Sequence, residues 1–328
     1  MKTYVYKLQF EGSTHFGDTG IDLENVCEWV SSDTLFSALV NALYSTKGSD
    51  AATELVNNFK ENPPFIMSSL FLYCKDSFYL PRPLADDSIS PDLKKAMGKE
   101  LKKIKWLNAN GFLKWIKGNL TVDDIKVMHS EQEKYKKAFT VEIRPRVTLD
   151  RTTQNSSIYH AGYVYFKEDA GLYGLVAFND STSKEKFQLL LKSLGEIGLG
   201  GEKAYGCGMF KVEPLQEVSG SFKSLLEGHF DRLTLLSLYH PAVNEQTAIT
   251  DSLVAYDVTR KKGWISSGRY ALPLKRKSVG FFTEGSVLKK RPKGCLVDVT
   301  PDHISSGMLN HKVYRYGYAF TAPLWGTP

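Results

Sequence analysis

An alternation of apolar and polar residues over positions 3–10 predicts a first strand, with tyrosine and phenylalanine along one face. A helical repeat follows to about residue 46, with Ser32 or Asp33 as its cap and Gly48 as its stop. A second helix is predicted over 51–60. The chain therefore begins with a strand, a long connection and a helical segment.

Strand patterns return on both sides of a lysine-rich region. Residues 65–74 and 78–80 predict one hairpin, and residues 158–166 and 172–178 predict another across the turn 168–171. A further strand is predicted at 139–149, a helix at 184–197 and a closing strand from 209 to about 215. Without the lysine-rich region the order is β-α-β-β-α-β, which is typical of ferredoxin-like or RRM-like folds.

The region 81–138 differs in composition from its surroundings. Prolines mark its start, and helices are predicted over 92–106, 111–117 and 122–137. We interpret this region as a helical insertion into a β-rich domain that spans residues 1–219. A composition shift near Ser219 separates it from residues 220–328, whose short strands predict a second, degenerate ferredoxin-like domain. The predicted fold class is thus α+β, with two ferredoxin-like domains.

Charge is distributed unevenly along the 328 residues. Residues 1–62 carry four Lys/Arg against nine Asp/Glu, whereas residues 220–328 carry fifteen against eight, within a net charge of +6. A basic C-terminal third favours a polyanionic ligand, and the acidic stretch from Asp18 to Glu28 suggests a protein interface. Ordinary surface variation is the alternative.

Several classes of protein are not indicated. The four cysteines are scattered without a CxxC pair, which favours a reducing cytoplasm and argues against structural zinc. No stretch has the apolar length of a membrane span, and the first residues lead into a strand rather than a signal peptide. We expect a cytoplasmic protein without a metal or other cofactor.

A glycine-rich loop between the last helix and last strand of the first domain is the most distinctive motif. Dinucleotide and P-loop sites need the reverse order, strand to helix, so this loop is neither. Its glycines permit positive φ and close backbone approach, while a lysine and a tyrosine suit a nucleic-acid backbone. A helix stop followed by a bulged strand is the alternative. We also expect Gly200→Val combined with Gly206→Val to disrupt RNA binding while leaving the fold largely intact. The candidate RNA contacts in this loop are Gly198, Gly200, Gly201, Lys203, Tyr205, Gly206 and Gly208.

A second basic cluster lies in and beside the 139–149 strand. Arg144 and Arg146 alternate and so project from one face, and Arg151 follows the strand. Tyrosines at 159, 163 and 165 place aromatic rings near these cations, a combination that binds single-stranded nucleic acid. Plain solvent exposure is the alternative for all three arginines.

His15 is the one candidate for chemistry. It follows the first strand and could act as a general acid or base in RNA cleavage or contact a phosphate. The alternative is a loop histidine satisfied by the backbone. HExxH, GxSxG and metal-ligand spacings are all missing from the sequence, so we expect no catalytic residues and no metal ligands.

Three features together resemble the RAMP proteins of CRISPR effector complexes, most closely the Cas5-like fourth subunit of type III-A (Csm) complexes. They are the loop 198–208, the helix start at 32–39 and the arginine run 144–151. The resemblance implies an antiviral ribonucleoprotein subunit that holds the 5′ handle of the crRNA without cleaving it. It also implies contacts with the Cas10-type large subunit and with a backbone RAMP subunit.

The resemblance also assigns roles to individual segments. The glycine loop would cradle the handle, the three arginines would contact phosphates or bases, and residues 152–157 would form the tip of a thumb-like hairpin. Because related RAMP proteins cleave RNA, some of them with a histidine near the first loop, a crRNA-processing endoribonuclease remains an alternative. A single-stranded nucleic-acid binder that works alone is another.

Overall fold

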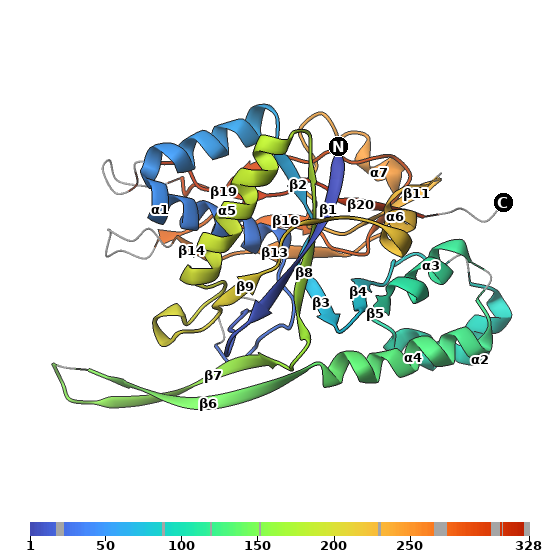
Figure 1. Cartoon of the computed structure of the whole chain (residues 1–328), viewed down its shortest axis with the longest axis horizontal. Helices are drawn as coiled ribbons and strands as arrows, with labels where there is room; N and C mark the ends of the chain where they lie inside the picture. The colour runs from blue at the N-terminus through green and yellow to red at the C-terminus, as the bar shows by residue number, and fades with distance from the viewer. Residues whose placement is uncertain are drawn as a thin grey trace.

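The computed structural model describes residues 1–17, 23–86, 89–118, 120–150, 152–228, 231–265, 274–302, 309 and 311–324. The described chain contains helices and strands that pair into antiparallel sheets, so the fold is mixed α and β (Figure 1). In the part of the chain that the structure describes, no helix is long and apolar enough to cross a membrane.

The largest sheet is built around two long strands. It has the order β10-β1-β8-β3-β4-β5, with β2 also paired to β8 and β9 also paired to β1. Every pairing is antiparallel, and Val5 lies opposite Leu175 where β1 meets β8. The strands are β1 (Lys2–Phe10), β2 (Phe65–Met67), β3 (Phe71–Cys74), β4 (Ser77–Pro81), β5 (Trp106–Asn108), β8 (Ala170–Phe178), β9 (Phe210–Val212) and β10 (Gln216–Glu217).

Two helices cover one face of this sheet. Helix α1 (Ser32–Glu61) is broken at Gly48, whose φ of 87° and ψ of −176° are not helical, and α5 (Ser181–Ile197) lies beside it (Figure 1). Their apolar side chains form the first core with β1 and β8; among them are Leu35, Leu39, Phe187, Leu191 and Leu194. Glycine at the break fits a backbone conformation that other residues rarely adopt.

The cap predicted for α1 is wrong in its detail. Ser31, not Ser32 or Asp33, stands at the N-cap position, and it makes no side-chain capping bond. The carboxylate of Asp33 instead accepts hydrogen bonds from the Arg315 guanidinium and from the Tyr316 amide (3.2 Å). A buried carboxylate needs a partner, and here the partner comes from the other end of the chain.

The lysine-rich region forms a separate helical lobe at the lower right of Figure 1. It contains α2 (Pro91–Lys103), α3 (Ala109–Lys117) and α4 (Val122–Lys137), with β5 between the first two. A second core joins this lobe to the far side of the sheet through the side chains of Phe71, Leu107, Phe112, Trp115 and Tyr173.

Strands β6 (Phe139–Leu149) and β7 (Ser156–Phe166) form a two-stranded ribbon that projects from the body (Figure 1). The predicted hairpin of 158–166 with 172–178 is therefore wrong. Strand β7 pairs with β6 along its whole length, whereas β8 lies between β1 and β3. All nine residues of β8 are buried, which a central strand satisfies and the outer strand of a hairpin would not.

The C-terminal part has a smaller sheet in the order β12-β17-β11-β20. Tyr316 and Tyr318 from this part belong to the first core, and Phe320 and Leu324 belong to the second. Its elements are α6 (Gly220–Leu226), β11 (Arg232–Leu235), α7 (Ile249–Ser252), β12 (Leu253–Ala255), β13 (Val258–Lys261), β14 (Trp264–Ile265), β15 (Leu274–Lys275), β16 (Val279–Phe282), β17 (Val287–Leu288), β18 (Leu296–Asp298), β19 (Tyr314–Tyr316) and β20 (Thr321–Leu324).

Candidate nucleic-acid interface

The segment after β1 lies between the glycine loop and the ribbon. The amides of Gly201 and Gly208 donate to the carbonyl oxygens of His15 (2.8 Å) and Ser13 (2.9 Å). On the other side, the backbones of Thr14 and Val164 exchange hydrogen bonds of 2.8 and 2.9 Å. This segment thereby fixes the glycine loop against the base of β7.

Most of the loop glycines are required by the protein's own packing. A Cβ at Gly200 would lie 2.5 Å from the His15 carbonyl oxygen, and one at Gly208 would lie 2.0 Å from that of Leu199. Gly198, Gly200, Gly206 and Gly208 all have positive φ. The expectation that Gly200 tolerates valine is wrong, because backbone occupies the space. Gly206 faces open space and is restricted only by its φ of 76°.

His15 is 5% exposed, and its Nδ1 lies 2.8 Å from the carbonyl oxygen of Gly162. A carbonyl only accepts, so Nδ1 carries the proton and donates. The ring lies beneath Gly201, where an added Cβ would approach its Cδ2 to 2.7 Å. His15 therefore ties the base of the ribbon to the glycine loop.

A cavity of about 710 Å³ opens beside this junction. Trp29, Tyr44 and Trp264 supply aromatic surface, and Lys203 and Lys261 supply positive charge. Partial burial lowers the pKa of the Lys203 ammonium. The lining residues are His15, Phe16, Gly17, Cys27, Trp29, Val30, Ser31, Thr34, Ala38, Asn41, Tyr44, Ser45, Ile197, Gly200, Gly201, Lys203, Lys261 and Trp264.

The ribbon presents its arginines toward the glycine loop. Arg146 donates through Nη2 to the Tyr163 hydroxyl (2.7 Å), and its guanidinium lies 4.2 Å from the ring centre of Tyr205. Arg144 lies on the same face, pairs with Glu142 (2.8 Å) and sits 5.3 Å from the ring centre of Tyr165. Tyr205 and Lys203 belong to one 3₁₀ turn, so this turn connects the cavity to the ribbon.

The opposite face of the ribbon is apolar and exposed, with Val141, Ile143, Val147, Leu149 and Ile158 in solvent. His160 also lies on that face, 3.6 Å from a carboxylate oxygen of Glu24. Arg151 and residues 18–22 of the acidic stretch lie outside the described residues, so their predicted roles stay predictions.

The structure brings together His15, Gly200, Gly201 and Lys203 in the cavity, and Arg146 and Tyr205 beside it. Four further lining residues were not predicted from the sequence, because only folding brings them together: Trp29, Tyr44, Lys261 and Trp264. The run of basic residues at 260–262, beside a tryptophan at 264, was the available signal. Over the described ranges, His, Cys, Asp and Glu side chains form no group of three or more that could hold a metal ion.

Residues 7–211 match the model of the RAMP superfamily, which is more than half of the chain. The chain belongs to the RAMP superfamily. Residues 230–324 of this RAMP protein also match the model described as the CRISPR Csm4 C-terminal domain.

Known proteins align with most of this RAMP chain. It is 29% identical over 299 residues to the "CRISPR system Cms protein Csm4" of Thermococcus onnurineus, covering 88% of this chain and 89% of that one. Its identity to the Csm4 protein of Methanocaldococcus jannaschii is 22%, with 98% and 97% covered.

Solved structures share the fold. The crystal structure of a Csm3-Csm4 subcomplex of a type III-A CRISPR-Cas interference complex contains a chain that is 18% identical, with a TM-score of 0.65 and full coverage of both chains. A chain in the Csm1-Csm4 cassette with pppApA is 22% identical, with a TM-score of 0.60 and coverage of 99% and 98%.

Proposed function

We propose that this RAMP protein is the Csm4-type subunit of a type III-A CRISPR effector complex, where it binds the 5′ handle of the crRNA without cleaving it. Both halves of the chain match models from this family, and the Csm4 relatives align along nearly their full length. The protein would act in the cytoplasm, as part of a ribonucleoprotein for antiviral defence.

One observation carries the RNA-binding part of the proposal. The 3₁₀ turn of the glycine loop places Lys203 in an aromatic cavity and Tyr205 under the guanidinium of Arg146. Single-stranded RNA is bound by such alternation of stacking rings and cations, because every base offers a π face and every phosphate a charge. The arrangement gives a strand a continuous path from the cavity to the ribbon.

The amides of the loop have a smaller part in this proposal than its side chains. Those of Gly201, Gly206 and Gly208 already donate to carbonyl oxygens of the protein itself. The glycines shape the loop and hold it on residues 13–15, and Lys203 and Tyr205 meet the RNA.

Partners follow from the relatives. The solved structures that contain similar chains are described as Csm1-Csm4 and Csm3-Csm4 assemblies. We propose that this chain likewise contacts a Cas10-type large subunit and a backbone RAMP subunit.

The strand orders support the finer prediction of two ferredoxin-like units. Taking β2 and β3 as one strand and β9 and β10 as another, the large sheet has the order fourth, first, third, second, all antiparallel, and β4 and β5 extend it beyond the second strand. The small sheet, read as β20-β11-β17-β12, has the same order with short or missing helices. The division at residue 219 stays a prediction.

Expression with the neighbouring genes, purification and sequencing of the copurifying RNA tests the proposal. We expect crRNAs with a common 5′ end and sister subunits in fixed ratio. A chain that purifies alone and does not bind a repeat-derived RNA would contradict it.

A cleavage assay tests the noncatalytic part. The wild-type chain and His15→Ala are incubated with repeat RNA in the absence of metal. We expect neither to cleave, because His15 is buried and its Nδ1 is committed to Gly162. Cleavage by the wild type that His15→Ala abolishes would favour the endoribonuclease.

A further inference from the structure

The helical lobe encloses a second cavity that shares no lining residue with the first. Its volume is about 460 Å³, and it opens between β5, α3 and α4. Apolar side chains form its wall: Trp106, Leu107, Leu113, Val127 and Met128. Val127 is 60% exposed and lies on α4 between Asp124 and Glu131, which also line the cavity.

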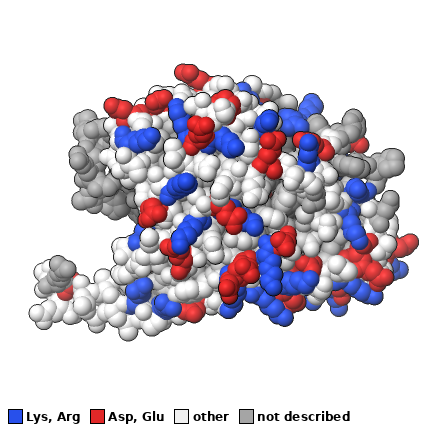
Figure 2. Space-filling view, in the orientation of Figure 1, with Lys and Arg blue, Asp and Glu red and all other residues white. Residues whose placement is uncertain are grey.

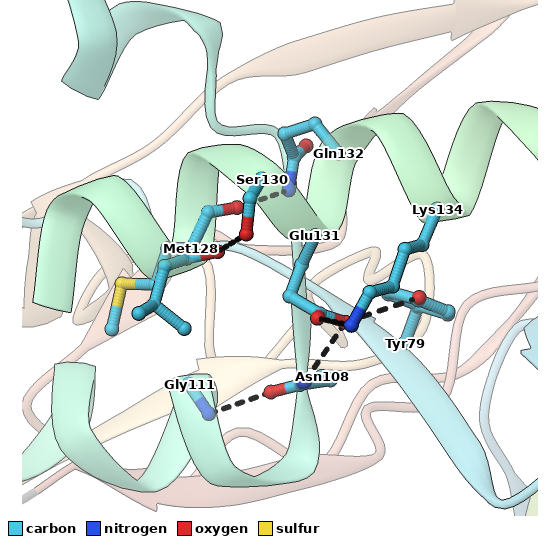
Figure 3. Close-up of polar contacts among 9 residues, drawn as sticks. Tyr79, Asn108, Gly111, Met128, Ser130, Glu131, Gln132 and Lys134 are labelled. Carbon is cyan, nitrogen blue, oxygen red and sulfur yellow. Dashed lines mark hydrogen bonds and ion pairs between the residues drawn. The ribbon is translucent and has the colours of Figure 1, made fainter.

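Four polar side chains of the cavity lining, Asn108, Lys114, Asp124 and Glu131, are already bonded within the protein, and Figure 3 shows the bonds of Asn108 and Glu131. Asn108 accepts from the Gly111 amide (2.8 Å) and donates to Glu131 (3.2 Å). Glu131 also accepts from the Tyr79 hydroxyl (3.4 Å) and from Lys134, and Asp124 pairs with Lys114. A ligand therefore meets an apolar wall and a rim on which these four polar side chains are already bonded.

The lobe around the cavity is basic. Residues 91–137 contain twelve lysines against six Asp and Glu, a net charge of +6 that equals that of the whole chain. Figure 2 shows blue Lys and Arg side chains along the lower right edge, with red Asp and Glu side chains among them, where Figure 1 places α2 and α4. The two carboxylates in the cavity lining are neutralised by Lys114 and Lys134.

We infer that this cavity binds an apolar side chain presented by an acidic segment of a protein partner. Exposed apolar surface in a concave site is typical of protein interfaces, and a basic surround attracts an acidic partner. An RNA base fits less well, because only one of the five apolar side chains of the wall, Trp106, is an aromatic ring on which a base could stack. The inference rests on the proposed function only in placing the partner among the subunits of the effector complex.

Photo-crosslinking in the assembled complex identifies the occupant. The residue p-benzoylphenylalanine replaces Val127 in the full chain, which is coexpressed with the sister subunits, purified with its RNA and irradiated. The matched control carries the same residue in place of Val122, which is 40% exposed on the same helix and outside the cavity lining. We expect a protease-sensitive adduct at 127 only, mapping to a segment rich in Asp and Glu around an apolar residue.

Charge variants test the same surface by affinity. Val127→Glu should weaken binding of the crosslinked subunit about tenfold, while Val127→Lys and the control Val122→Glu should change it less than threefold. An adduct that ribonuclease removes, a basic crosslinked segment, or no adduct in a complex that retains its RNA would each overturn the inference. Failure of the proposed function is a different result, namely a chain that copurifies with neither RNA nor subunits.

Discussion

Arg146 connects the ribbon to the glycine loop, since its guanidinium stacks on Tyr205 and bonds to Tyr163. If a phosphate binds there, Arg146→Gln removes one cation from the RNA path. The slope of log K against log salt should then fall by about 0.7, the value for one phosphate of a single strand. Electrophoretic or anisotropy titrations with handle RNA at several salt concentrations measure it.

A matched control for Arg146 is Lys223→Gln, which neutralises a cation on α6 that lies near Glu227. Its slope should equal that of the wild type. Equal slopes for both variants would remove Arg146 from the RNA interface.

Gly200 and Gly206 both have positive φ, but a side chain at these two positions would meet different surroundings. Alanine at either position costs about 1–2 kcal/mol for the left-handed backbone. At Gly200 the new Cβ would also meet the His15 carbonyl at 2.5 Å, whereas Gly206 faces open space. Gly200→Ala should therefore lower the midpoint of thermal unfolding clearly more than Gly206→Ala.

The control is Gly98→Ala in α2, where no atom obstructs a Cβ and the midpoint should stay or rise. Equal losses at 200 and 206 would contradict the close packing on His15.

At the scale of the element, α4 begins with a capping box whose acid also pairs with α3. Hydrogen bonds from Lys114 and Thr121 hold the pKa of the Asp124 carboxyl at about 2, below its ordinary value of 3.8. A lowered folded-state pKa means that the ionised group stabilises the fold above pH 4 and loses this effect as the pH falls toward 2.

Asp124→Asn should consequently destabilise the lobe by about 1 kcal/mol at pH 7, a value that allows for the exposed Lys114. The difference from the wild type should shrink as the pH falls from 4 toward 2. Unfolding monitored by circular dichroism across this range measures it. Asp123→Asn is the neighbouring control, because Asp123 is 89% exposed and outside the box. A loss that does not vary with pH would argue against the ion pair with α3.

Periodicity located most of the elements but not all of their neighbours. The helices of the lobe and the break at Gly48 follow from local pattern and turn chemistry, which act within a few residues. The pairing of β7 with β6 rather than β8 depends on which strand is buried on both faces, a property of the whole sheet. The loop glycines are close in sequence and could be found as a motif. Lys261 and Trp264 reach the same cavity only through the tertiary fold, so the sequence did not place them there.

The resemblance to RAMP proteins was confirmed by the family match. It had assigned the glycines to RNA, and the geometry gives them a second explanation, close packing on residues 13–16. A motif can thus identify a superfamily while its residues serve the fold. The side chains that the loop carries, rather than its glycines, are the better targets for RNA-binding variants.

At the scale of the whole molecule, the two parts of the chain share their cores and one buried ion pair. Asp33 and Arg315 have side chains only 1% and 6% exposed, and Arg315 also donates to the Lys262 carbonyl oxygen (2.6 Å). Arg276 lies close enough that Arg315 and Asp33 both influence its pKa, which burial lowers. The Asp33–Arg315 pair therefore connects the N-terminal helix to the C-terminal strands, and Arg276 lies close to it.

Because Arg276 lies near the Asp33–Arg315 pair, we expect the two single variants of the pair to lose different amounts of stability. Arg315→Met leaves Asp33 with Arg276 nearby, whereas Asp33→Asn leaves the buried Arg315 without its counter-charge and close to a second cation, Arg276. Removing one partner of a buried pair typically costs about 3–5 kcal/mol, so Asp33→Asn should lie at the upper end and Arg315→Met lower. The double variant should lose less free energy of unfolding than the two single variants lose together, since neither charge of the pair then remains without its partner. Chemical unfolding of all four proteins, followed by tryptophan fluorescence, gives the cycle. Additive losses, or a greater loss for Arg315→Met, would show that the pair does not hold the two parts together.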